Sequence, residues 1–228
     1  MRHAFLVAAL SLVVAAPVAA AELPPAPVLD PEPGVLASGE GFYLRGDVGY
    51  AMPIDPALSI NGLGYIGERL DKNATFGLGL GYDFGWLRAD VTGDVFAERS
   101  LSASAPGLAA TAKLNSVAVL ANLYADLGTW SGITPYVGAG AGLAVNRLGS
   151  VRETATATGT DIAYDGGTRT GFAWALMAGA AIDITTSLKF DLGYRFADLG
   201  KARAAGGAVR VGDLRSHEVR FGLRYTFD

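Results

Sequence analysis

His217-Glu218-Val219-Arg220-Phe221-Gly222-Leu223-Arg224-Tyr225-Thr226-Phe227 is the stretch of sequence that determines the expected fold. Large apolar residues occupy every second position, and charged residues, threonine or glycine fill the positions between them. Successive side chains of a β-strand point to opposite faces of the sheet. The stretch therefore predicts a strand with one apolar face and one face of polar or very small side chains.

Seven further segments show the same alternation, and they lie near residues 42–50, 75–84, 87–95, 116–127, 136–146, 170–183 and 188–196. The segment at 170–183 alternates least regularly. Most of the segments have about ten residues, which suits a tilted strand that crosses a bilayer in roughly 9–11 residues. Strands of soluble proteins are shorter, with a mode of about 5–6 residues. Eight long strands are therefore expected.

The connections between these segments alternate in length. Short turns are expected near residues 84–86, 128–133 and 184–187, and long polar links near 52–73, 99–113, 147–169 and 197–214. Bacterial outer-membrane barrels have short periplasmic turns and longer extracellular loops. The sequence thus predicts an all-β fold, an eight-stranded antiparallel transmembrane β-barrel over residues 41–228, with short periplasmic turns and long extracellular loops.

Alternation alone leaves a second fold open, a soluble eight-stranded barrel with its apolar face inside. Glycines crowd the polar face, as at Gly77, Gly79 and Gly81, and small residues suit the narrow interior of an eight-stranded barrel. Aromatic residues gather near the strand ends, as in the interfacial girdles of outer-membrane barrels. They are Phe42, Tyr82, Phe84, Trp86, Tyr225 and Phe227 at one rim and Tyr50, Phe172, Trp174 and Phe196 towards the other. These features favour the membrane barrel.

The polar face carries charges of both signs, which predicts a paired charge network in the lumen. Its expected members are Arg45, Asp47, Arg88, Asp90, Asp94, Asp126, Lys189, Asp191, Arg195, Glu218, Arg220 and Arg224. An eight-stranded barrel is filled by its own side chains. We therefore expect the network to be structural, and a narrow ion path through rearranging pairs stays open as an alternative.

The N-terminal region predicts export from the cytoplasm. Residues 1–21 contain a basic start at Arg2, an apolar stretch over 4–16 and small residues suited to cleavage, which together are typical of a signal peptide. Residues 22–40 are rich in proline and are expected to form an extended periplasmic linker. No apolar run beyond residue 21 is long enough for a membrane helix, which needs about 18–20 residues.

Four segments, 41–50, 134–140, 192–200 and 217–227, resemble the alphaproteobacterial outer-membrane barrel and surface-antigen ("porin") family, relatives of the opacity and OmpA-type barrels. The resemblance implies location in the outer membrane and insertion by the barrel-assembly machinery, which reads a final strand that ends in an aromatic residue. Tyr225 and Phe227 fit this assembly signal, although Asp228 follows them. Small members of the family are mostly structural or surface proteins, despite the porin label.

Three functions follow as hypotheses: a structural or surface barrel that supports membrane integrity and exposes loops, a narrow pore, and an adhesin that binds through loops. We expect no enzyme, cofactor or metal site, because the chain has no cysteine and a single histidine, His217, after the signal segment. The side chains of Ser216 and His217 should point to opposite faces, which disfavours a catalytic pair.

Membrane lipid, lipopolysaccharide and the barrel-assembly machinery are the expected partners. Peptidoglycan and the host surface stay open as further partners. The net charge of −4 gives no support for nucleic-acid binding, which usually shows a clustered basic face. A monomer is expected.

Overall fold

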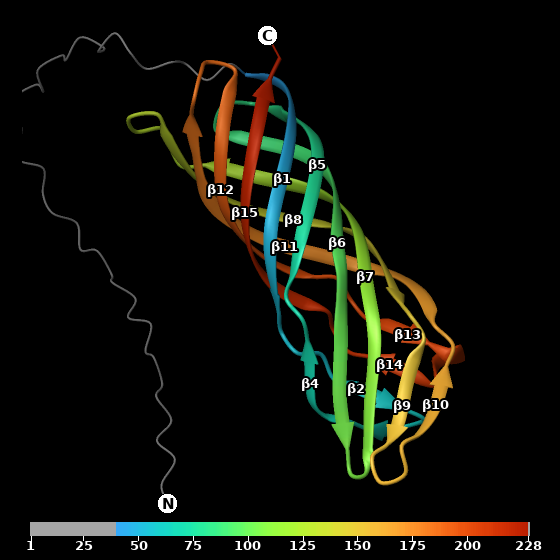
Figure 1. Cartoon of the computed structure of the whole chain (residues 1–228). Helices are drawn as coiled ribbons and strands as arrows, with labels where there is room; N and C mark the ends of the chain where they lie inside the picture. Colours follow the sequence, from blue (N-terminus) through green and yellow to red (C-terminus); the bar gives the residue numbers. More distant parts are fainter. Residues whose placement is uncertain (1–39, 228) are drawn as a thin grey trace, which may run out of the picture. The chain divides into compact units, whose positions relative to one another are not determined.

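Eight antiparallel strands close into a barrel in the computed structural model, which describes residues 40–227 (Figure 1). The strands are β1 (Gly41–Pro53), β5 (Asn73–Asp83), β6 (Leu87–Ala105), β7 (Leu108–Asp126), β8 (Ile133–Leu148), β11 (Gly167–Asp183), β12 (Leu188–Asp198) and β15 (Arg215–Thr226). Each strand pairs with its sequence neighbour in this set, and β1 pairs with β15 to close the ring. The expected signal segment, almost all of the linker and Asp228 lie outside the described residues.

The apolar face of the barrel wall points outward, as the alternation predicts. Along β15, Phe221 and Leu223 are 44% and 51% exposed, whereas Arg220 and Arg224 on either side of this pair are buried inside the barrel. The same parity holds in β5, where Leu78 is exposed. The soluble barrel with its charges in water is therefore wrong for this part of the chain.

Short turns join the strands at one end, here called the turn end. Phe84–Trp86 connect β5 to β6, and Gly85 at the centre has a φ of 90°, a conformation that glycine adopts without steric cost. Residues 184–187 connect β11 to β12. Both the first and the last barrel strand have their outer termini at this end (Figure 1).

The expectation of four long polar links at the opposite end was wrong in its details. The 99–113 link is not a loop, because β6 and β7 continue as a hairpin of two 19-residue strands with Pro106 and Gly107 between them. The other three links contain short elements: β2 (Leu58–Ile60), β3 (Leu63–Gly64), β4 (Ile66–Leu70), β9 (Val151–Ala155), β10 (Thr160–Tyr164), β13 (Ala202–Ala204), the 3₁₀ turn η1 (Ala205–Gly207) and β14 (Val209–Val211). No helix within residues 40–227 is long and apolar enough to cross a membrane.

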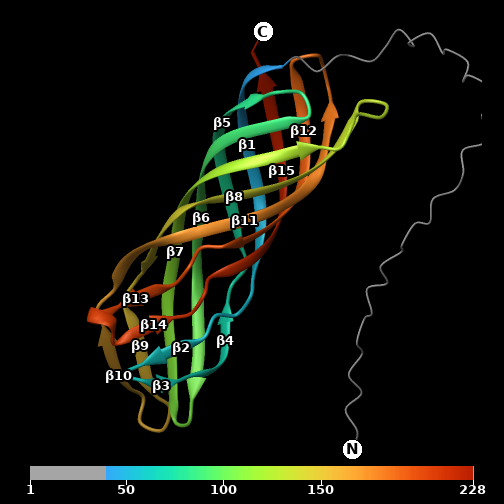
Figure 2. The same cartoon turned by 180° about the vertical axis from the view of Figure 1, so that it is seen from behind.

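These elements and the extended β6–β7 hairpin form a folded cap over the barrel mouth (Figure 2). Strands β13, β14, β2 and β3 make a separate sheet, and its Ile60 and Val209 pack in one apolar core with Leu101, Leu114 and Val151 of the other sheet. The interior therefore has two layers, a charged layer within the barrel wall and an apolar layer within the cap. Only the charged layer was predicted from the sequence.

A β-bulge in β6 marks the boundary between the two layers. The register of β6 against β7 shifts between Phe96 and Arg99. Before the bulge the outward residues are apolar, as at Val95, and after it they are polar, as at Glu98 and Ser100. A polar outer face belongs in water, so the lipid-facing part of the wall ends at this level.

Candidate functional site: the charged lumen

The charged layer begins with a cluster around Arg45. Its guanidinium lies 2.8 Å from Asp47 Oδ1 and 3.1 Å from Asp90 Oδ2, and it donates a 2.9 Å hydrogen bond to the Tyr124 hydroxyl. The Tyr43 hydroxyl donates to Asp90 at 2.9 Å. Strands β1, β6 and β7 each supply part of this cluster, so it crosslinks the wall from inside.

A second cluster centres on Asp94, whose side chain is fully buried. Asp94 forms ion pairs with Arg195 at 2.9 Å and with Arg220 at 2.7 Å. Arg195 also pairs with Glu218 at 2.8 Å, and Arg220 reaches Asp47 of the first cluster at 3.4 Å. Because β6 and β12 are not neighbours in the barrel, the pair between Asp94 and Arg195 spans the lumen.

A third set of ion pairs lies nearer the turn end. Arg88 pairs with Asp126 at 2.7 Å, Arg224 pairs with Asp191 and Asp83 at 3.3 Å each, and Lys189 pairs with Asp183 at 3.2 Å. All twelve residues expected in the lumen thus lie there and carry an opposite charge within ion-pair distance. Asp83 and Asp183 were not among the expected residues, although strand parity places both on the inner face.

Aromatic side chains complete the layer. The guanidinium carbon of Arg88 lies 4.9 Å from the ring centroids of both Tyr124 and Tyr136, a cation–π distance. Tyr43 and Asn122 are buried beside them. The three tyrosines and Asn122 were not included in the expected network, but strand parity identifies all four as inward-facing.

Glycines on the inner face provide the room for these side chains. A Cβ atom at Gly77 would stand 2.5 Å from Arg220 Nη2, and one at Gly222 would stand 2.4 Å from Asp47 Oδ1. Both distances are well below van der Waals contact. The glycine alternation in the sequence therefore reflects a lumen packed with long charged side chains.

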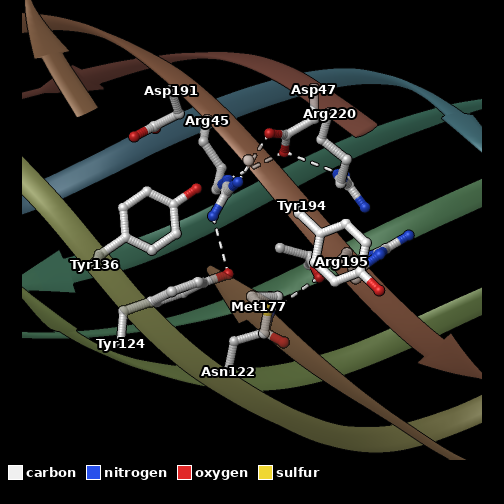
Figure 3. A pocket seen from close by; sticks show the side chains of 12 residues that line it. Arg45, Asp47, Asn122, Tyr124, Tyr136, Met177, Asp191, Tyr194, Arg195 and Arg220 are labelled. Atoms are coloured by element: carbon white, nitrogen blue, oxygen red, sulfur yellow. Dashed lines mark hydrogen bonds and ion pairs between the residues drawn. The ribbon is translucent and has the colours of Figure 1, made fainter. Parts of the chain in front are cut away.

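In the middle of the layer lies a cavity of about 20 Å³, lined by side chains that include Arg45, Tyr124 and Arg195 (Figure 3). A wider recess of about 230 Å³ beside Asp83, Asp126 and Lys189 lies at the turn end. A site of roughly 10–15 Å³ is the least that holds one water molecule. The cavity therefore has room for a water molecule but not for a hydrated ion or a solute.

Arg99 lies between the charged layer and the cap. It is 3% exposed, and its Nη2 donates a 3.1 Å hydrogen bond to the Ser116 hydroxyl. Within residues 40–227 it has no carboxylate at ion-pair distance, so its buried charge is balanced by hydrogen bonding and aromatic contact alone. The guanidinium carbons of Arg99 and Arg195 lie 5.6 and 5.7 Å from the ring centroid of Phe96. Phe96 thus contacts a charged residue of each interior layer.

A carboxylate joins two connections of the cap. Glu153 of β9 accepts hydrogen bonds from the hydroxyls of Tyr65 and Tyr164, the latter at 2.8 Å, and Asn61 donates to the Tyr164 hydroxyl at 3.2 Å. Burial, followed by the bond to Glu153, raises the pKa of Tyr65. The bond to Glu153, followed by burial, raises the pKa of Tyr164. The first and third connections are therefore fastened to each other.

The outer surface shows the expected aromatic clusters at the turn end. The ring centroids of Phe42 and Tyr82 are 4.9 Å apart, and those of Tyr82 and Phe84 are 4.6 Å apart. Tyr225 and Phe227 are half-exposed, with centroids 5.3 Å apart.

Within the part of the chain that the structure describes, no group of three or more histidine, cysteine or acidic side chains is arranged to hold a metal ion.

Comparison with known proteins gives the family. Residues 6–227 match the model of the outer membrane protein beta-barrel domain. An uncharacterized protein of Brucella abortus is 31% identical over 88% of this chain and 89% of its own length. A Rickettsia felis protein with the name "Putative adhesin" is 28% identical over 82% of this chain and 88% of its own.

Among solved structures, the outer membrane protein OprG of Pseudomonas aeruginosa shares the fold with a TM-score of 0.54 and 17% identity, over 85% of this chain and all of that one. The match of the family model covers nearly the whole chain, and the barrel wall has the apolar outer face that lipid requires. The chain belongs to the outer-membrane β-barrel family of bacteria, and its location is the outer membrane.

Proposed function

We propose that this protein is a non-conducting barrel that anchors a folded cap on the outer face of the outer membrane and supports the integrity of that membrane. The observation that carries the proposal is the double closure of the interior. The middle of the charged layer has space for little more than a water molecule, and an apolar core fills the cap above it.

Opening a path through the charged layer would require buried ion pairs to separate. The pairs of Asp94 with Arg195 and Arg220 cross the lumen at distances below 3 Å. Removing one partner of a buried pair typically costs about 3–5 kcal/mol. A cost of this size keeps an open lumen rare, which is why we favour a structural barrel over the narrow pore.

The test is single-channel recording in planar bilayers. We expect no conductance steps from protein whose insertion is verified by heat-modifiable gel migration and protease protection. A variant with the side chains of Asp94, Arg195 and Arg220 truncated to alanine serves as the positive control, because it empties the middle of the charged layer. Reproducible, salt-dependent steps from the unmodified protein would refute the proposal in favour of a pore.

An adhesive role of the cap is a second candidate. The hydrogen bonds of Glu153 and the apolar core hold the cap in a fixed shape. This supports adhesion, because binding sites commonly lie on loops held by a rigid scaffold. The name of the Rickettsia felis relative points the same way. Deleting the hairpin at residues 151–164 should abolish attachment of bacteria to host cells while barrel migration on gels stays normal. Unchanged attachment would count against adhesion through this hairpin.

We further propose that the protein has no catalytic activity and acts as a monomer inserted by the barrel-assembly machinery through Tyr225 and Phe227. Ser216 hydrogen-bonds to Glu218 inside the barrel at 3.2 Å, whereas His217 contacts the Tyr194 hydroxyl on the outer face at 2.6 Å. A serine and a histidine on opposite sides of the wall cannot form the hydrogen bond that a nucleophile and its base need, which supports the absence of catalytic activity.

A further inference from the structure

The lipid-facing wall contains an apolar groove that the closed lumen does not explain. Its volume is about 590 Å³, within the range of pockets that take small apolar ligands, about 300–1,000 Å³. Two outward glycines, Gly46 of β1 and Gly93 of β6, form hollows in it. Its sides are apolar, with Phe76, Phe190 and Phe221 as the largest residues.

These two glycines are not required by the packing of the barrel. A Cβ atom at Gly93 would meet nothing within 4 Å, and one at Gly46 would only reach ordinary contact with Leu78 at 3.5 Å. By contrast, a Cβ at the inward Gly77 would collide with Arg220 and Asp94. The crowded lumen accounts for the inner glycines, whereas the outer ones leave a groove that larger residues could fill.

The groove crosses five neighbouring strands, β6, β5, β1, β15 and β12. Four strand spacings of about 4.8 Å give it a length of roughly 19 Å. One leaflet contributes about 15 Å to a hydrocarbon core of about 30 Å. The groove is therefore long enough for a single lipid chain.

We propose that this groove holds one acyl chain of a surrounding outer-membrane lipid as a bound, ordered ligand. The groove lies on the apolar wall between the aromatic clusters, where hydrocarbon chains surround the barrel. A second copy of the protein would present a rigid convex wall that touches the rims, whereas a flexible chain can follow the floor between Phe76 and Phe221. The shape of the groove thus favours an acyl chain over a second copy as its occupant.

The experiment is native mass spectrometry of the full barrel released from nanodiscs of dimyristoyl phosphatidylglycerol. A second apolar hollow of about 650 Å³ beside Leu80, Val91 and Leu123 also faces lipid. We therefore expect Gly93→Leu, which fills the groove, to lower the mean number of retained lipids by about one per barrel. Ala178→Leu, an outward substitution on β11 away from the groove, is the matched control and should retain the lipid.

Spin-labelled phosphatidylglycerol gives a second readout within the bilayer. We expect the motionally restricted fraction to fall by about one lipid per barrel in Gly93→Leu, with unchanged heat-modifiable migration as proof of folding. Equal lipid retention in all three proteins, or no retained lipid at all, would overturn the proposal. A dimer that Gly93→Leu abolishes would also overturn it, in favour of a second copy as the occupant.

Discussion

Replacing Asp94 with asparagine is the sharpest perturbation of the charged layer. The substitution keeps the size of the side chain but removes the charge that faces Arg195 at 2.9 Å and Arg220 at 2.7 Å. Loss of one partner from a buried ion pair costs about 3–5 kcal/mol. Arg195 keeps Glu218 and Arg220 keeps Asp47 at 3.4 Å, so we expect the lower end, about 3 kcal/mol.

A loss of about 3 kcal/mol corresponds to roughly a hundredfold change in the ratio of folded to unfolded protein. The assay is equilibrium unfolding by urea from lipid vesicles, followed by fluorescence of the three tryptophans. Asp161→Asn is the control, because its partner Arg152 is an exposed residue of the cap at 2.8 Å, and we expect no measurable shift in its midpoint. A stability of Asp94→Asn within about 1 kcal/mol of the original would refute the view that buried pairs hold the lumen closed.

Three further outcomes are expected. Gly142→Ala should lower the free energy of unfolding by about 1–3 kcal/mol, because the new Cβ would clash with a backbone carbonyl oxygen. In the same urea titration, Gly93→Ala should leave the free energy of unfolding unchanged, because its Cβ would meet nothing within 4 Å. Glu153→Gln should speed protease cleavage of the cap while the barrel fragment survives, and equal cleavage rates would count against the fastening. Hydrogen bonding and burial raise the pKa values of Tyr65 and Tyr164, so their neutral forms stabilise the cap below the ordinary tyrosine pKa of about 10, and this stabilisation is lost at higher pH. Absorbance should show part of the alkaline tyrosine titration shifting to lower pH in Glu153→Gln, and an unchanged titration would count against the bond to Glu153.

The barrel wall could be predicted from sequence because its two faces differ strongly in chemistry. In β15, arginines alternate with phenylalanine, leucine and tyrosine, so parity alone identifies the lumen side. The same parity gave every charged residue of the expected network. Parity assigns a residue to one face of the sheet, but it gives neither its position along the barrel axis nor its partner. The pairing of Asp94 with Arg195, 101 residues away, could therefore be identified only from the closed barrel.

The cap could not be predicted because the two faces of its strands differ little in polarity. Beyond the bulge, β6 alternates leucine and alanine with serine, as at Leu101, Ser102 and Ala103, and such a segment is hard to distinguish from a polar loop. The bulge also shifts the alternation by one residue. Up to Phe96 the even-numbered residues of β6 face inward, and from Arg99 onward the odd-numbered residues do. If the alternation of the first part of β6 is continued past the bulge, every later residue of β6 is assigned to the wrong face.

The extended β6–β7 hairpin has a consequence for biogenesis. Its outer side carries serines and the exposed ion pair of Glu98 with Lys113. During insertion these polar groups have to cross the hydrocarbon core of the membrane before they reach water. The two sheets of the cap can bury Leu101 and Val209 against each other only after this passage. Translocation of the hairpin therefore comes first and maturation of the cap last, and a mutation that unravels the cap leaves an inserted barrel behind.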